Sequence, residues 1–209
     1  TLAAFINCML ETQQRHILTI EDPIEFIFKH TENSIIHQRE VKRDTHSFSI
    51  ALKAALREDP DVIYIGEMRD LETIQLAITA AETGHLVLGT LHTSSAAKTV
   101  ERIVDVFPAD QQEQARLQVS TSLAGIMSQT LCKNKKGKRS LAYEIMVNTP
   151  AIGNLIREKK VSEIYSQLQS GRNYGMNTLE QCLNNLYSDG LIVKEEALGR
   201  ASNPKAIKL

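Results

Sequence analysis

The chain has 209 residues, of which 42% are hydrophobic and 23% charged, a size and balance typical of one ordinary domain with room for a small appendage. Its 24 Lys and Arg residues nearly balance its 25 Asp and Glu residues, and the formal net charge of -1 excludes a global field that would attract nucleic acid or an acidic membrane. Cys8, Cys132 and Cys182 are far apart and form no CxxC pair, which argues against a structural zinc site and a disulfide scaffold and fits a reduced, cytoplasmic setting. The apolar runs are far shorter than the roughly 20 residues that span a bilayer.

The N-terminal part of the sequence predicts a helix followed by a strand. Apolar residues recur at helical spacing over residues 1–10, and the segment from His16 to Ile20 has the length and character of a strand that Asp22-Pro23 ends. The alternation of apolar and polar residues from there through Gln38 predicts a hairpin or edge strands in a peripheral insertion. Since the first residues are typical of the middle of a helix, with no secretion signal and no initiating Met, we expect the sequence to be a fragment.

The middle of the sequence alternates helices with apolar strands. Ser47 caps a predicted helix, and Val62–Ile65 is an uninterrupted apolar run typical of a strand buried on both faces. Asp70 caps the next predicted helix, and Leu86–Leu91 is the next predicted buried strand. This βαβ order predicts an α/β fold with a parallel sheet.

The remainder of the sequence predicts mainly helices. Two of them, over 95–106 and 110–128, are separated by Pro108, and strand-like runs flank a basic segment, Lys133–Arg139. A solvent-exposed hairpin tip is favoured over a binding patch for that segment. Beyond Pro150 the pattern is wholly helical. The sequence therefore predicts a core over 1–148 and a C-terminal helical subdomain over 149–209.

Acidic and imidazole side chains follow three predicted strands at the point where each ends. Glu21 and Asp22 end the first strand, Glu67 follows the second and His92 follows the third. Because the carboxyl ends of parallel strands meet at one edge of a sheet, where ligands bind, we expect these groups in one crevice. A carboxylate fixed at a strand end suits the orientation of a water that attacks a phosphate, which makes Glu67 the candidate. The carboxylates of Glu21 and Asp22 suit the water shell of Mg²⁺, and the imidazole of His92 suits a phosphate. The alternative for each of these residues is a helix cap or an ordinary surface position.

Three ordered motifs resemble the boxes of the secretion ATPase superfamily, which serves type IV pili and type II secretion. Residues 20–25, IEDPIE, resemble its Asp box, and residues 59–70, from DPD through GEMRD, resemble its Walker B box. Residues 84–93, GHLVLGTLHT, resemble its His box. The resemblance extends over essentially the whole chain and implies a RecA-like P-loop ATPase core.

The resemblance also implies a ring of six identical subunits that hydrolyses ATP with Mg²⁺. Glu67 and Glu25 are implied as the acidic catalytic pair. The residues implied to lie about the nucleotide or the metal are Glu21, Asp22, His85, His92 and Thr93. The candidates for contacts with phosphate or a neighbouring subunit, with surface ion pairs as the alternative, are Arg39, Arg43 and Arg69.

The C-terminal helices indicate the retraction type within this superfamily. Residues 151–158, AIGNLIRE, resemble the AIRNLIRE signature of retraction ATPases, with Gly153 where the signature has Arg, and residues 174–179 resemble the GMxTL turn that follows it. We expect Leu155 and Ile156 to pack and the two charged residues after them to face outward, as in any amphipathic helix. The four-cysteine zinc element common in assembly and secretion ATPases does not occur, so no structural metal site is expected. The matched signature residues are Ala151, Ile152, Asn154, Leu155, Ile156, Arg157 and Glu158.

A phosphate-binding loop of the form GxxxxGK[ST] does not occur in the sequence. Thr1-Leu2-Ala3-Ala4 resembles the residues that directly follow this loop in the family, so the chain is expected to begin just after it and to lack the upstream PAS-like domain. We therefore expect this polypeptide alone to bind ATP poorly and not to hydrolyse it, whereas the parent protein does.

The expected function is retraction of type IV pili in twitching motility. The resemblance implies that ATP hydrolysis moves the ring and withdraws pilin subunits through an inner-membrane platform protein, at the cytoplasmic face of that membrane. An accessory retraction ATPase, or one for pilus assembly or type II secretion, stays open because of the altered signature helix. Two other classes are a nucleic-acid-binding module using Lys133–Arg139, which near-zero net charge and 5% aromatic residues disfavour, and an inactive assembly module.

Overall fold

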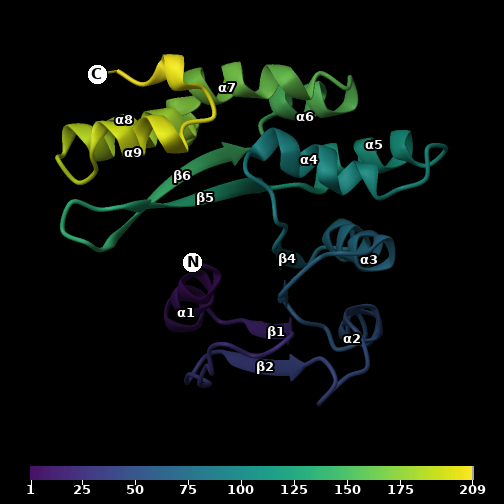
Figure 1. Ribbon diagram of the computed structural model, residues 1–209. Helices are drawn as coiled ribbons and strands as arrows, with labels where there is room; N and C mark the ends of the chain where they lie inside the picture. The colour runs from purple at the N-terminus through teal and green to yellow at the C-terminus, as the bar shows by residue number, and fades with distance from the viewer. Residues whose placement is uncertain (209) are drawn as a thin grey trace. The chain divides into compact units, whose positions relative to one another are not determined.

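A computed structural model describes residues 1–208 of the chain (Figure 1). These residues form two compact units, one comprising Thr1–His92 and the other beginning at Thr93. The predicted boundary between a core and a helical subdomain, after residue 148, lies inside the second unit and stays a prediction. Within the described residues, every helix is too short or too polar to cross a membrane.

A parallel sheet of four strands in the order β2-β1-β3-β4 forms the centre of the first unit. The strands are β1 (His16–Glu21), β2 (Ile35–Glu40), β3 (Val62–Ile65) and β4 (Leu86–Gly89). The register pairs Glu21 with Glu40 and Ile20 with Ile65, so the carboxyl ends of these strands lie at the same edge. The predicted α/β fold with a parallel sheet is therefore what the chain forms.

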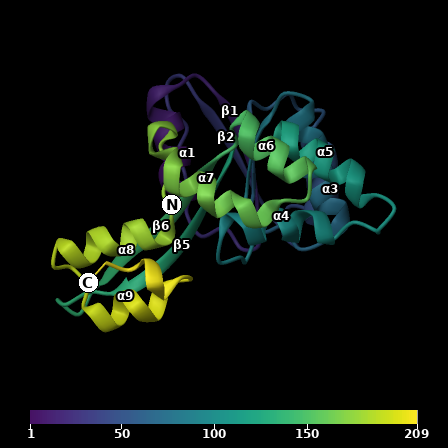
Figure 2. The same cartoon turned by 90° about the horizontal axis from the view of Figure 1, so that it is seen from above.

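Helices cover both faces of this sheet: α1 (Leu2–Thr12) on one, and α2 (Phe48–Ala55) with α3 (Leu71–Glu82) on the other. Figure 2 shows α1 and α3 on opposite sides of β1 and β2. Successive strand residues point to opposite faces, so Ile17 packs in the cluster with α1 and Leu18 in the cluster with α2 and α3. Both predicted caps are present. The Ser47 side chain accepts from the N–H of Ile50, and the Asp70 side chain accepts from the N–H of Thr73.

One expectation for the first unit was confirmed in part and one was wrong. Of the hairpin or edge strands expected after Pro23, an edge strand forms: β2 lies parallel to β1 at the edge of the sheet, and residues 22–34 contain no helix or strand. The reason is that backbone amides of this segment bond to side chains of β2 instead of to a partner strand. The strand predicted at Leu86–Leu91 ends at Gly89 and is not buried, because β4 pairs on one side only and leaves Leu86 44% exposed.

An antiparallel hairpin of β5 (Gly125–Lys133) and β6 (Arg139–Val147) organises the second unit. The basic segment forms the tip of this hairpin, as predicted. The predicted helix over 110–128 overran its true end, since α5 stops at Ser122 and the hairpin begins at Gly125. A side chain at Gly125 would come within 2.7 Å of the Met146 carbonyl, so close cross-strand pairing decides the structure here.

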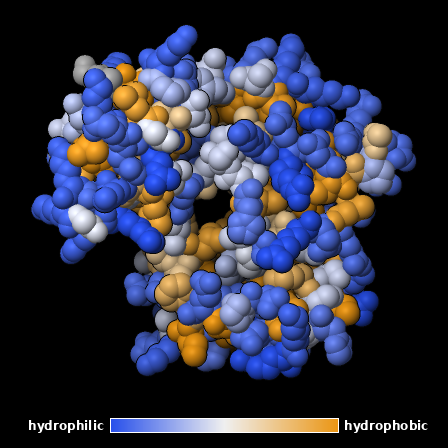
Figure 3. All heavy atoms as spheres, viewed as in Figure 1, coloured by the Kyte–Doolittle hydropathy of each residue, from blue (hydrophilic) through white to orange (hydrophobic). Residues whose placement is uncertain are grey.

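Helices make up the rest of the second unit. They are α4 (Ala96–Asp105), α5 (Gln112–Ser122), α6 (Pro150–Arg157), α7 (Ile164–Ser170), α8 (Leu179–Ser188) and α9 (Lys194–Arg200), with 3₁₀ turns at Val161–Glu163, Gly171–Tyr174 and Pro204–Ala206. α8 and α9 pack against the hairpin in a cluster that includes Cys132 and Cys182. All three cysteines are free, and burial raises the pKa of the Cys132 and Cys182 thiols. On the face seen in Figure 3, hydrophobic side chains reach the surface in several places between hydrophilic ones.

Candidate functional site

The carboxyl edge of the parallel sheet brings together groups that follow different strands. Glu21 and Glu40 are the last residues of β1 and β2, Glu67 follows β3 and His92 follows β4. The Nε2 atom of His92 lies 2.9 Å from Oε1 of Glu67. Two of the groups that the sequence placed at strand ends are thus in direct contact.

Gly66 lets the end of β3 lie against β1. Its N–H donates to the Ile20 carbonyl over 2.7 Å, and a Cβ atom at this position would lie 3.2 Å from that oxygen and 3.3 Å from the Cα atom of Glu21. Both distances are tighter than ordinary contacts, so any larger residue would push the two strands apart. The glycine therefore sets how closely the segment carrying Glu67 approaches β1.

Hydrogen bonds between the loops after β3 and β4 hold Glu67 near His92. The N–H of Met68 donates to the Thr90 carbonyl over 3.1 Å, and the Thr90 hydroxyl donates to the Gly66 carbonyl. Because Glu67 lies between the two residues bonded in this way, its backbone is fixed relative to the chain that leads to His92.

Glu67 is held in its ionised form. Arg69 pairs with Oε1 of the Glu67 carboxylate, and this hydrogen bond lowers the pKa of Glu67, with the charges of Arg69 and His92 adding to the effect. The side chains of Arg69 and His92 are 76% and 84% exposed. Exposed ion pairs contribute little free energy, so replacing either partner by a ligand costs little.

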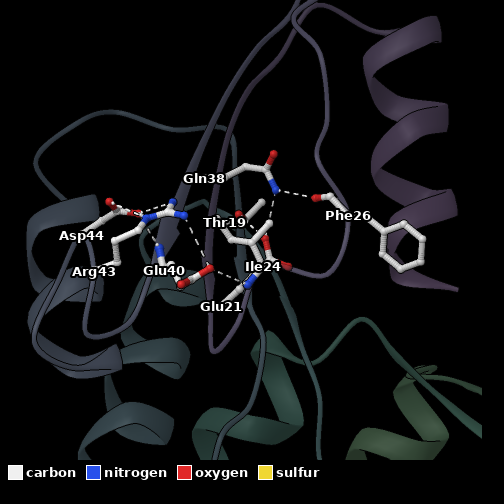
Figure 4. A network of polar contacts seen from close by, with 8 residues as sticks. All are labelled: Thr19, Glu21, Ile24, Phe26, Gln38, Glu40, Arg43 and Asp44. Carbon is white, nitrogen blue, oxygen red and sulfur yellow. Dashed lines mark hydrogen bonds and ion pairs between the residues drawn. The ribbon is translucent and has the colours of Figure 1, made fainter.

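Glu21 differs from the acidic residues that follow it. It is 5% exposed, and its Oε1 accepts from the Thr19 hydroxyl over 2.6 Å and from the amide of Gln38 over 3.2 Å (Figure 4). Asp22 and Glu25 are exposed, and within the described residues their side chains make no hydrogen bond or ion pair. Their carboxylates are therefore the ones free to meet a ligand.

Electrostatic effects place these carboxylates near the rest of the site. Burial raises the pKa of Tyr64, on β3, and the charges of Glu21 and Glu25 raise it further. Asp22 contributes to the raised pKa of Arg69, after the larger effect of its partner Glu67. The loop after β1 and the loop after β3 thus share one electrostatic environment.

The exposed carboxylates of Asp22 and Glu25 suit a Mg²⁺ site that waters and substrate phosphates complete. Within residues 1–208, no three His, Cys, Asp or Glu side chains are arranged to hold a metal ion on their own. Mg²⁺ commonly binds through one or two carboxylates together with waters and substrate phosphates. The exposed oxygens of Asp22 and Glu25 fit that kind of partial coordination.

His85 and Thr93 do not join this group. His85 precedes β4 and so lies at the opposite end of that strand from His92, with its Nδ1 atom 3.0 Å from the Ala80 carbonyl at the end of α3. Thr93 belongs to the second unit, where its hydroxyl lies 2.7 Å from that of Thr99.

Two of the three candidate arginines form ion pairs away from Glu67. Arg39 pairs with Glu58 over 2.8 Å, and Arg43 pairs with Asp44 over 2.7 Å. Both line a cavity of about 420 Å³ beside α2. Of the three, Arg69 alone contacts Glu67, one of the two acids implied as catalytic.

The signature helix α6 packs as predicted. Ile152 and Ile156 are fully buried, Leu155 is half-buried, and Arg157 and Glu158 are exposed. The Thr149 hydroxyl caps the helix by accepting from the N–H of Ile152.

Gly153 brings α6 close to α5. A Cβ atom there would lie 3.0 Å from the Ser120 carbonyl, and the Arg157 guanidinium lies 3.4 Å from the Ser120 hydroxyl. The position that carries Arg in the signature is thus a tight contact between two helices in this chain. Gly in place of Arg therefore changes packing as well as charge.

Sequence reasoning missed the polar residues of β2. Gln38 and Glu40 lie on the same face of the strand, two residues apart, and Glu40 ends it at the edge where the other acids gather. The search for acidic residues at the carboxyl ends of parallel strands would have found Glu40 if β2 had been recognised as a parallel strand.

Comparisons with known proteins identify the family of the chain. A model of the family "Type II/IV secretion system protein" matches residues 1–189. The chain belongs to this family. It is 57% identical over 205 residues to the type IV pilus retraction ATPase PilT of Pseudomonas aeruginosa, covering 98% of this chain and 59% of that protein. It is 56% identical over 208 residues to a twitching motility protein of Neisseria gonorrhoeae, covering 99% of this chain and 55% of that protein.

A solved structure supports the same family and fold. A crystal structure of the pilus retraction motor PilT with bound ADP matches with a TM-score of 0.91 at 53% identity, covering 98% of this chain and 58% of that chain. The predicted RecA-like secretion ATPase fold and the predicted superfamily are therefore confirmed. The chain spans between half and three fifths of the length of these relatives.

Proposed function

We propose that the full-length protein containing this chain is an ATP-hydrolysing motor that retracts type IV pili in twitching motility. The observation that carries the proposal is the geometry of Glu67, an ionised carboxylate at the carboxyl edge of a parallel sheet beside Arg69 and His92. The high identity to a retraction ATPase over almost the whole chain supports the same function.

The proposed function gives each residue a task in phosphoryl transfer. The Glu67 carboxylate is unprotonated at neutral pH, so it can orient the attacking water and accept its proton. Arg69 and His92, exposed and close to this carboxylate, are placed to offset the charge that develops on the phosphate.

The loop after β1 supplies the second group of acids. Asp22 would hold the water shell of a Mg²⁺ ion, which would supply charge neutralisation at the phosphates, and Glu25 would be the second acid of the catalytic pair with Glu67. Glu21 is buried and already hydrogen-bonded, so its part is to fix the start of this loop.

We further propose that the protein works as a ring of six identical subunits and acts on an inner-membrane platform protein from the cytoplasmic side of that membrane. The exposed hydrophobic side chains near the site, Phe26 at 58% and Ile27 at 88%, support a role in subunit contacts.

ATP turnover by the full-length protein in the presence of Mg²⁺ tests this function. Glu67→Gln keeps the size of the side chain and removes the base, and a fall in turnover of about 10²- to 10⁴-fold is expected. Glu101→Gln, at an exposed position of α4, is the matched control and should turn over at the parent rate. Equal turnover in both variants would reject Glu67 as the base.

An accessory retraction ATPase is the second candidate, and the glycine at position 153 of the signature helix favours it. Complementation separates the two. A motor restores twitching to a strain that lacks its own retraction ATPase, whereas an accessory protein does so only when that ATPase is present.

A further inference from the structure

The loop that carries Asp22 and Glu25 has no regular structure of its own. Residues 22–34 between β1 and β2 form neither helix nor strand, and most of their side chains are exposed. A segment of this kind loses conformational entropy when it is held in one place, so some interaction must offset that loss. For residues 24–28, the hydrogen bonds come from the side chains of β2.

Glu40 holds the first part of the loop. Its Oε2 atom accepts a hydrogen bond of 3.1 Å from the N–H of Ile24, the residue between the two exposed acids and next to Glu25. The same oxygen lies 3.7 Å from Nη1 of Arg43, whose guanidinium is itself held by Asp44 over 2.7 Å. One oxygen of the Glu40 carboxylate therefore lies near a basic side chain and also accepts from the loop.

Gln38 holds the second part. Its amide nitrogen donates to the Phe26 carbonyl over 2.8 Å and to Oε1 of Glu21 over 3.2 Å, and its amide oxygen accepts from the N–H of Phe28 over 2.9 Å. Donor and acceptor of one amide are thus both used, so no simple acid or amine could replace it. In Figure 4, Gln38 and Glu40 reach the loop from positions two residues apart on β2.

From these contacts we infer that Gln38 and Glu40 are positioning residues that clamp residues 24–28 and so place the carboxylates of Asp22 and Glu25 at the sheet edge. The role in catalysis rests on the proposed function. Catalytic groups must be held to within about half an ångström, and a misplacement of about 1 Å can cost 100-fold in rate. Three hydrogen bonds from one rigid strand supply such a hold to a loop without structure.

Amide hydrogen exchange on the full-length protein tests the hold without reference to activity. Glu40→Ala should raise the exchange rate of the Ile24 amide by about tenfold, since it removes a charge-assisted hydrogen bond. Glu40→Gln keeps an acceptor and should stay within about threefold of the parent. Gln38→Met is similar in size but has no amide donor or acceptor, and it should raise the exchange rate of the Phe28 amide by about tenfold as well. Glu58→Ala, which removes an ion pair of β2 that does not touch the loop, is the matched control and should change neither amide.

Steady-state kinetics then test positioning. Glu40→Ala should lower kcat for ATP by about tenfold while KM changes by less than about twofold, because the loop positions acids and does not bind the bulk of the nucleotide. Glu40→Gln should recover most of the loss, which a change in overall stability would not do.

Two results would overturn the inference. The first is an Ile24 amide whose exchange is the same in Glu40→Ala as in the parent, and the second is faster exchange with unchanged kcat. Should Glu40→Ala fail to fold, Gln38→Met decides the matter by the same two readouts. A folded parent without any turnover would reject the proposed function, while the exchange rates would still decide whether the clamp exists.

Discussion

Oε1 of Glu67 and Nε2 of His92 lie 2.9 Å apart, although the two residues follow different strands. A hydrogen bond between Thr90 and Gly66, which are 24 positions apart in the sequence, ties the two loops together. Parallel strands of similar length end at one edge, and this is what converts two distant sequence motifs into one site.

Gly66→Ala tests how closely β3 must lie against β1. The added methyl group would sit 3.2 Å from the Ile20 carbonyl, so we expect a loss of about 1–3 kcal/mol in the free energy of unfolding, with reduced turnover. Urea denaturation measures it. Gly199→Ala, where nothing lies within 4 Å of the new methyl group in α9, is the control and should be neutral or stabilising by up to about 1 kcal/mol. Equal stability of the two variants would show that β3 does not need the close approach.

Glu144 gives the second unit a pH-dependent stability. It is 5% exposed and accepts from the N–H of Ala96 over 2.8 Å, and burial raises its pKa, with the nearby Glu180 adding to the shift. A raised folded-state pKa means that the folded form binds the proton more tightly than the unfolded form. The contribution to stability is therefore full below the ordinary pKa of glutamate and is lost as pH rises through the raised value.

Glu144→Gln should remove this dependence. Its amide oxygen can still accept from the N–H of Ala96, and no charge is buried. We expect the stability of the parent relative to the variant to fall between acid and neutral pH, as followed by urea midpoints across that range. A difference that stays constant with pH, or one that grows, would contradict the burial of an ionisable Glu144.

Gly153→Arg restores the residue that the retraction signature carries. Since a Cβ atom would lie 3.0 Å from the Ser120 carbonyl, α6 and α5 must move apart, and a loss of about 1–3 kcal/mol is expected. Thermal unfolding measures it, with Ala151→Arg at an exposed position of α6 as the control for adding the same charge. A variant as stable as the parent would mean that the helix pair adjusts freely.

Much of this structure follows from local sequence patterns. The caps Ser47 and Asp70 and the apolar run Val62–Ile65 are local signals, and the structure has the elements they predict. The position of Glu67 beside His92 follows from topology alone, once a parallel sheet is recognised.

Other features depend on contacts that distant segments make. The side chains of Gln38 and Glu40 bond to backbone groups that are 10 to 16 positions away in the sequence. The end of α5 could not be placed because helical spacing continues past Gly125, whereas pairing with β6 decides the strand. The exposure of β4 likewise depends on which strands lie beside it.

A single-turnover experiment on the full-length protein tests whether Glu67 is the catalytic base. ATP is bound to the parent and to Glu67→Gln with Mg²⁺ present, and cleavage of the γ-phosphate is followed by rapid quenching. We expect the variant to bind ATP with the affinity of the parent and to cleave it at least about 100-fold more slowly. Cleavage at the parent rate by Glu67→Gln would contradict the assignment of Glu67 and the account built on it.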